Sequence, residues 1–189
     1  AIHAHNAYGA DIIMRILGDM HRALGAASYS ALGLGASAKT TEVRANAAEA
    51  LASLVDRGMF DTTLFAKELY WLLGQHHVMA QRIEQTFRDA ALISSLAGWR
   101  IMQVLEGILP AVGEVNRGGT LVQLLAQLAG EYGVSIKIPE VLRPKMKGST
   151  VLAKSLRALE KLQPHPTELA EQARDQAQEL LDQHRCAQP

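Results

Sequence analysis

One segment of this sequence comes close to a nucleotide-binding motif. Residues 33–40 read GLGASAKT, which differs at one position from the phosphate-binding pattern G-x-x-x-x-G-K-[ST]. Ala38 takes the place of the second glycine, and its methyl group would obstruct the close backbone approach that a phosphate requires. No β-branched run precedes the segment to form the strand of the motif. We therefore interpret residues 33–40 as a flexible loop in which Thr40 caps the next helix, and we expect no cofactor.

The histidines are the side chains best suited to bind a metal, because a neutral imidazole is a common ligand. They are His3, His5, His21, His76, His77, His165 and His184. No two of them share a helix face at four-residue spacing with an acidic neighbour, and the single cysteine, Cys186, is far along the chain. The sequence also lacks a nucleophile elbow and a Cys/His site, so no catalytic residue can be nominated. We expect neither a metal site nor an enzyme.

Basic side chains are concentrated in one segment, residues 137–161, which holds seven basic and two acidic side chains. The basic residues are Lys137, Arg143, Lys145, Lys147, Lys154, Arg157 and Lys161. One interpretation is a binding strip for an acidic partner or for a phosphate backbone. The other is a solvated face, or a face paired with the acidic residues Glu168, Glu171, Asp175 and Glu179 of the last predicted helix.

Composition excludes several classes of protein. The 19 basic and 19 acidic residues of the 189-residue chain cancel, so no overall field attracts nucleic acid or an anionic membrane. No apolar run of about 18 residues is free of charges, which argues against a membrane span. A lone cysteine cannot form an internal disulfide, and we expect a cytoplasmic location. The chain begins at Ala1 rather than Met, so we expect it to be part of a longer protein.

A largely apolar stretch, residues 95–112, occupies the middle of the chain. Its polar side chains Arg100, Gln103 and Glu106 recur every three residues, and nearly all the others are apolar. A helix that is apolar over most of its circumference is covered by neighbours on several sides. We therefore predict a central buried helix whose narrow polar strip lines the exposed surface.

Further helices are predicted on both sides of this stretch from apolar spacing and capping residues. A first helix follows Asn6 and ends at Gly25; later ones are expected at about 41–57, 61–74, 80–92, 120–132, 150–162 and from Thr167 onward. Short connections favour antiparallel hairpins. Helix pairs start near Thr41, Ala80 and Thr120, a period of about 40 residues, which is typical of HEAT and armadillo repeats.

The predicted fold is accordingly all-α, a right-handed stack of antiparallel helical hairpins with about seven or eight helices. We divide it into an N-terminal helix and connector (1–38), the repeats (39–163) and a capping helix (164–189). Trp71 lies beside the apolar stripe of its helix, so it is either an exposed anchor for a partner or, as we expect, packed against the adjacent hairpin.

A resemblance supports this interpretation. The helix TEVRANAAEALASL (41–54), with Arg44 after an acidic and aliphatic start, resembles the first helix of a HEAT pair. Residues 43–58, 99–109, 138–142 and 148–159 together resemble the C-terminal region of a bacterial family of unknown function, associated with MoxR-type ATPases and von Willebrand factor A proteins. The similarity spans roughly Thr40 to Leu162 and implies a scaffold role within a larger protein. The family has no assigned catalytic residues, so none is transferred to this chain.

Two functional hypotheses follow. The first is a non-enzymatic scaffold that binds another protein through Arg100, Gln103 and Glu106. The alternative is a nucleic-acid-binding repeat protein that uses Lys145, Lys147, Lys154, Arg157 and Lys161. We expect no membrane interaction.

Overall fold

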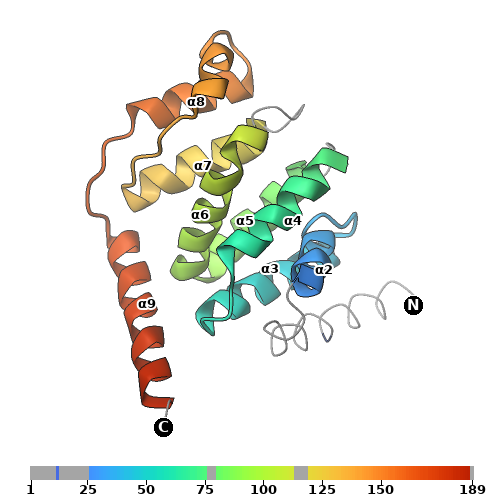
Figure 1. Cartoon of the computed structure of the whole chain (residues 1–189), viewed down its shortest axis with the longest axis vertical. Coiled ribbons are helices and arrows are strands. Elements are labelled where there is room, and N and C mark those ends of the chain that lie inside the picture. The colour runs from blue at the N-terminus through green and yellow to red at the C-terminus, as the bar shows by residue number, and fades with distance from the viewer. Residues whose placement is uncertain (1–11, 13–25, 76–79, 113–118, 188–189) are drawn as a thin grey trace.

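The structure is a computed structural model that describes residues 12, 26–75, 80–112 and 119–187. These residues form helices joined by short connections and contain no strand, as predicted (Figure 1). The elements are α2 (Ala26–Ala36), α3 (Thr41–Asp56), α4 (Thr62–Gln75), α5 (Ala80–Ile93), α6 (Ser95–Val112), α7 (Gly119–Tyr132), the 3-10 helix η2 (Glu140–Met146), α8 (Val151–Lys161) and α9 (Glu168–Ala187). The helix predicted between Asn6 and Gly25 lies outside the described residues, except for Ile12.

Side-chain caps are found at the predicted starts of α4, α8 and α9, whereas Thr40, the expected cap of α3, makes no side-chain cap bond. An Asp or Thr side-chain oxygen placed just before the first turn accepts a backbone N–H that would otherwise have no partner. The N–H of Leu64 donates to Asp61 Oδ1 (3.0 Å), that of Ala153 to Thr150 Oγ1 (3.1 Å), and that of Ala170 to Thr167 Oγ1 (3.1 Å).

The helix α2 differs from the prediction. It continues through Gly33 and Gly35 to Ala36, where a flexible loop was expected. Both glycines are buried, because α2 packs on α3, α4 and α5. A Cβ on Gly33 would lie 3.5 Å from Leu72 of α4, within ordinary contact distance. Tertiary packing therefore outweighs the low helix propensity of glycine in this segment.

The helices stack in two rows. In the first row α3 packs on α5 and α5 on α7, and in the second α4 packs on α6 (Figure 1). The helix α6 also contacts α5, α7 and α9, which makes it the central buried helix that the sequence predicts. The helices α3 and α4, the first predicted pair, make few direct contacts with each other. Each of them packs mainly on a helix of another pair, α3 on α5 and α4 on α6.

One residue, Ser94, forms the corner between α5 and α6. Its hydroxyl donates to Asp56 Oδ1 at the end of α3 (2.7 Å) and accepts the backbone N–H of Ala97 (3.2 Å). The second bond caps α6. Ser94, which is buried, therefore lies between the end of α5 and the start of α6 and links both helices to the end of α3.

The α6–α7 contact is close because Gly98 has no side chain. The ring of Tyr132 from α7 fills the space beside Gly98, and its hydroxyl donates to the carbonyl of Ser95. The same ring packs edge-on against Trp99, with the centroids 5.4 Å apart. Burial raises the pKa of Tyr132 to about 12, because ionisation would leave a phenolate in an apolar site.

After α7 the chain makes an excursion and returns. Gly133 takes a left-handed conformation (φ 64°) and its carbonyl accepts the backbone N–H of His165 (2.9 Å). Between these two residues, η2 and α8 pack on each other and α8 packs on α7. The chain then enters α9, which lies against α6 and α7. A single buried core includes Leu32 of α2, residues of the helices α3 to α8, and Ala170 and Ala173 of α9.

Candidate functional site

The polar strip of α6 is less exposed than predicted. Arg100 and Gln103 are half-buried, and only Glu106 is fully exposed. Arg100 Nη1 donates to Gln103 Oε1 (2.9 Å). Arg100 lines a small cavity that α6 shares with α9, whereas Gln103 lines a larger groove between α6 and α4. Arg100 and Gln103 therefore line different depressions although their side chains are hydrogen-bonded, because α9 and α4 approach α6 from different directions.

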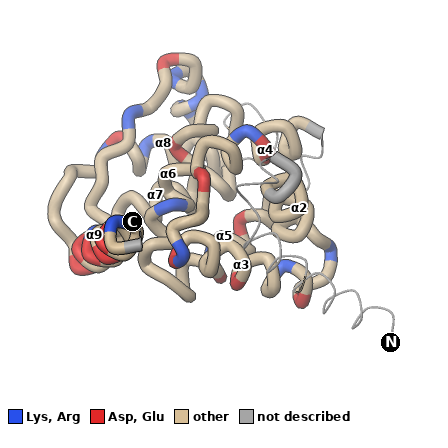
Figure 2. Tube along the Cα trace, turned by 60° about the horizontal axis from the view of Figure 1, so that its bottom comes forward, with Lys and Arg blue, Asp and Glu red and all other residues tan. Residues whose placement is uncertain are grey.

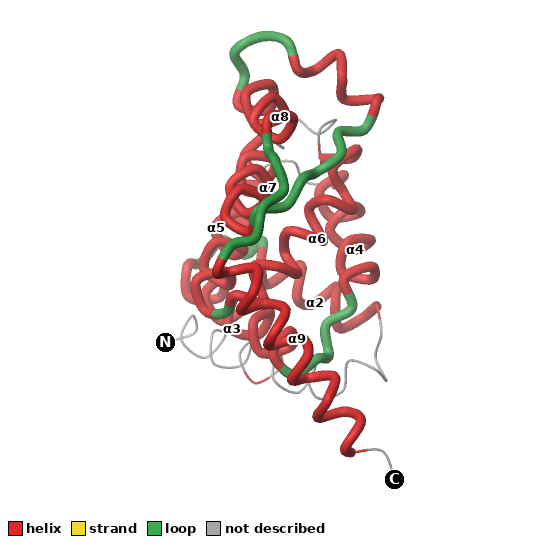
Figure 3. The backbone as a smooth tube through the Cα atoms, turned by 90° about the vertical axis from the view of Figure 1, so that its left-hand side faces the viewer, coloured by secondary structure: helices red, strands yellow, loops and turns green. Residues whose placement is uncertain are grey.

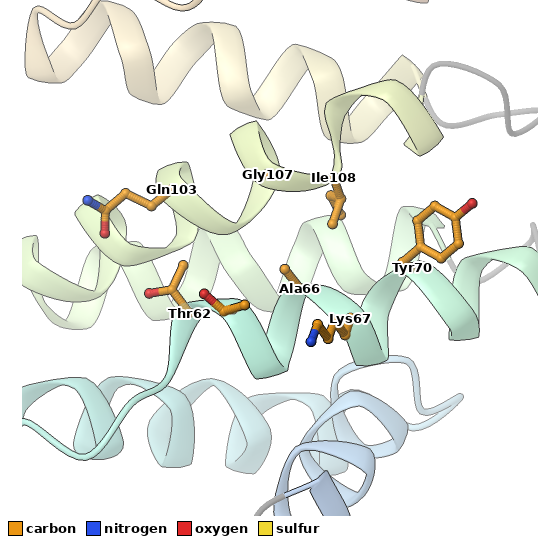
Figure 4. A pocket seen from close by; sticks show the side chains of 8 residues that line it. Thr62, Ala66, Lys67, Tyr70, Gln103, Gly107 and Ile108 are labelled. Carbon is orange, nitrogen blue, oxygen red and sulfur yellow. The ribbon is translucent and has the colours of Figure 1, made fainter.

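The groove between α4 and α6, here called the α4–α6 groove, has a volume of about 440 Å³ (Figure 4). Its lining residues are Thr62, Thr63, Ala66, Lys67 and Tyr70 from α4, and Gln103, Gly107 and Ile108 from α6. Hydroxyl and amide groups gather at one end, Ala66, Gly107 and Ile108 form the middle with Lys67 beside them, and Tyr70 stands at the other end (Figure 4). Such a mixed lining suits a peptide segment better than a charged small molecule.

The groove exists because α6 lacks bulk on the side that faces α4. Gly107 contributes no side chain, and a Cβ added there would meet nothing within 4 Å. Pro110, one turn later, has no N–H to donate to the carbonyl of Glu106. A proline inside a helix bends it, and the ribbon of α6 changes direction beside Gly107 and Ile108 (Figure 4).

Two exposed aromatic side chains follow one another on α4, and the first of them, Tyr70, lines the α4–α6 groove. Tyr70 and Trp71 are 61% and 59% exposed. The expectation that Trp71 packs against the adjacent hairpin is wrong, because the apolar stripe through Phe65, Leu69 and Leu72 already fills the inner face of α4. Exposed aromatic rings are the most frequent anchors of protein interfaces.

The seven basic residues between positions 137 and 161, here called the basic surface, lie on η2, α8 and their flanking segments. All are exposed except Arg157, which is half-buried. Arg157 Nη1 donates to the carbonyls of Met146 (2.6 Å) and Gly148 (2.8 Å). Arg143 pairs with Glu160 (2.8 Å). These two arginines hold the loop before α8 in place, and the lysines provide the outward charge.

The acidic last helix does not cover the basic surface. The helix α9 packs on α6 and α7, while α8 packs on α7 and η2. Lys and Arg gather around α8, and Asp and Glu follow one another along α9, at a distance from each other (Figure 2). The sequence-based alternative of pairing between these helices is therefore wrong. Glu140 and Glu160, from the same segment, both pair with Arg143.

The near-motif at residues 33–40 cannot hold a phosphate in this structure. Its first half, residues 33–36, forms the end of α2, where the backbone groups bond within the helix, as in Ser37 N–H to the Gly33 carbonyl (3.1 Å). Arg44 is buried beside it and donates to the carbonyls of Ala38 (2.7 Å) and Lys39 (3.0 Å). The segment thus presents carbonyl acceptors to an arginine rather than N–H donors to an anion.

No group of three or more His, Cys, Asp or Glu side chains that could hold a metal occurs among the described residues. His3, His5, His21, His76 and His77 lie outside them. Within the part of the chain that the structure describes, no helix combines the length and the apolar character needed for a bilayer span.

Sequence reasoning missed the α4 wall of the groove, although a signal was present. Thr63, Ala66, Lys67 and Tyr70 follow the three- and four-residue spacing of one helix face, adjacent to the apolar stripe. Gly107 lies on the central helix, four residues after Gln103.

Comparison of the chain with protein-family models, curated proteins and solved structures finds no match.

Proposed function

We propose that this chain is a non-enzymatic helical-repeat scaffold that binds a segment of another protein in the α4–α6 groove. The observation that carries the proposal is the open groove on the second row of helices, with the exposed ring of Tyr70 in its lining and exposed Trp71 as the next residue on α4. The resemblance to HEAT-like repeats and to a family associated with MoxR-type ATPases supports a role inside a larger chain or complex.

The lining defines the chemistry of the partner segment. Ala66, Gly107 and Ile108 offer an apolar floor, which suits one or two apolar side chains of a partner. Lys67 is exposed at the wall and suits an acidic group next to them. We infer a short amphipathic segment with apolar and acidic residues as the ligand.

A site-specific photo-crosslinker at Thr63 tests this proposal. In native lysate the variant should give a discrete adduct with one protein, whereas a crosslinker at Glu49, exposed on α3, should not. Filling the groove by Gly107→Leu should reduce the adduct at least about tenfold, because an interface anchor is worth about 2 kcal/mol or more.

Gly74→Leu is the matched control. Gly74 is also helical, and a Cβ there meets nothing within 4 Å, but it does not line the groove. If Gly107→Leu and Gly74→Leu give the same amount of adduct, the groove is not the binding site. Absence of any stoichiometric adduct from Thr63 would count against the scaffold function itself.

A further inference from the structure

Exposed lysines on α8 and exposed acids on α9 have the same spacing. Lys154 and Lys161 are seven residues apart on α8, and both are exposed. Glu168, Asp175 and Asp182 are each seven residues apart on α9, and all are exposed. We call the first set the lysine stripe and the second set the acidic stripe. Seven helical residues rise about 10.5 Å, so adjacent charges in the two stripes are equally far apart.

The members of each stripe share one face of their helix. A shallow depression on the outer side of α9 is lined by Asp175 and Asp182 together with residues of α9 alone. On α8, the exposed Val151 and Ala158 stand at the same helical spacing as the two lysines. Ala158 lies between the lysines, and its small side chain allows another helix to approach closely.

The two stripes cannot meet within one molecule. The helix α8 lies at one end of the long axis, and α9 extends to the other end (Figures 1 and 3). Each helix is fixed in place, α8 by α7 and η2 and α9 by α6 and α7. The charge of each stripe is therefore not compensated by the other in the monomer.

We propose that the lysine stripe is a docking surface for the acidic stripe of a second copy of this chain. The helix α9 of one molecule would lie along α8 of the next, with Lys154 and Lys161 facing two successive acids. Such a contact is heterologous, because it joins different surfaces and leaves one stripe free at each end. A single exposed ion pair changes a binding constant by less than about fivefold, so the association is weak and depends on ionic strength.

Sedimentation velocity of the full chain over a range of concentrations tests this proposal. At low ionic strength the average mass should rise with concentration, and in about 0.5 M salt, where the Debye length is only a few ångströms, it should return to that of the monomer. The variant Lys154→Gln/Lys161→Gln should weaken association at low salt about tenfold. The matched control Ser53→Glu/Gln81→Glu changes the net charge equally at exposed positions of α3 and α5, and should leave association unchanged.

Charge reversal provides the specific test. Lys154→Glu/Lys161→Glu should be monomeric alone, and so should Asp175→Lys/Asp182→Lys. An equal mixture of the two variants should associate, because each then carries the complement of the other. A monomer at every salt concentration, or association that ignores these substitutions, would overturn the proposal. Binding of DNA that requires Lys154 and Lys161, without self-association, would also overturn it and would favour the nucleic-acid alternative.

Discussion

Gly98 and Gly107 both lie on α6 and have opposite surroundings. A Cβ on Gly98 would overlap the Tyr132 hydroxyl and come within 3.2 Å of its Cζ, whereas a Cβ on Gly107 would meet nothing within 4 Å. We predict that Gly98→Ala lowers the free energy of unfolding by about 1–3 kcal/mol through overpacking, although alanine is the better helix former. Gly107→Ala should raise it by about 0.5–1 kcal/mol. Urea unfolding of both variants measures the difference.

Tyr132→Phe provides the control for the first of these substitutions. Without the hydroxyl, the closest atom to the new methyl group is gone, so Gly98→Ala should cost clearly less in the Tyr132→Phe background than in the natural sequence. Equal costs in both backgrounds would show that the overlap with the hydroxyl is not the cause.

The raised pKa of Tyr132 predicts a loss of stability in alkali. The phenol ionises near pH 10 in the unfolded chain and near pH 12 in the folded one. Between these values the folded state holds the proton more tightly, so the free energy of unfolding falls as the pH rises. For Tyr132 this fall is at most about 2–3 kcal/mol, and buried Tyr29, whose pKa is also raised, acts in the same direction.

Unfolding of the natural chain and of Tyr132→Phe at pH 9 and at pH 11.5 checks this prediction. The phenylalanine variant starts from a lower stability at pH 9, because the hydrogen bond to the Ser95 carbonyl is lost. Its further decline to pH 11.5 should be smaller than that of the natural chain. An equal fall in the free energy of unfolding of the two proteins would contradict the assignment of the alkaline loss of stability to Tyr132.

At the scale of single elements, the two halves of α9 differ in burial. Ala170 and Ala173 are fully buried against the core, whereas the residues from Leu181 to Cys186 are exposed. We predict that a chain ending at Thr167 loses about 2–4 kcal/mol in the free energy of unfolding, because the removal of α9 uncovers apolar surface of α6 and α7. A chain ending at Gln183 should keep nearly all its stability, and thermal unfolding compares the two.

Locally determined features of the elements were predictable from the sequence. Asp61, Thr150 and Thr167 cap helices through contacts within three residues of themselves, so the sequence around each contains the whole interaction. The extent of α6, residues 95–112, was also predictable, because the apolar spacing that defines it is contained in the segment itself. The helical state of Gly33 and Gly35 was not, because it depends on Leu72 and other residues distant in the sequence.

The candidate surfaces were only partly predictable. The basic surface is visible as composition, but whether α9 covers it depends on the path of the chain after α8. The strip of Arg100, Gln103 and Glu106 was correctly placed on α6, yet its division between two depressions depends on how α4 and α9 approach. Side-chain spacing gives the face of a helix and leaves the neighbour of that face undetermined.

For the whole molecule, the stack predicts an uneven distribution of local stability. The helix α6 is covered by α4, α5, α7 and α9, whereas α8 rests on α7 and η2. We predict that backbone amides in the middle of α6 exchange with solvent only through global unfolding, and that those of α8 exchange through local opening at lower free energy. Hydrogen exchange followed by mass spectrometry measures both, and equal protection of α6 and α8 would contradict a graded stack.

The hydrogen bond between the His165 N–H and the Gly133 carbonyl joins the start and the finish of the excursion through η2 and α8. All seven members of the basic surface lie inside this closed segment. Segments whose ends adjoin can be exchanged or inserted without rerouting the rest of a fold. Residues 134–164 can thus be regarded as a cassette, whose outer charge can be varied in evolution or by design while the passage from α7 to α9 stays the same.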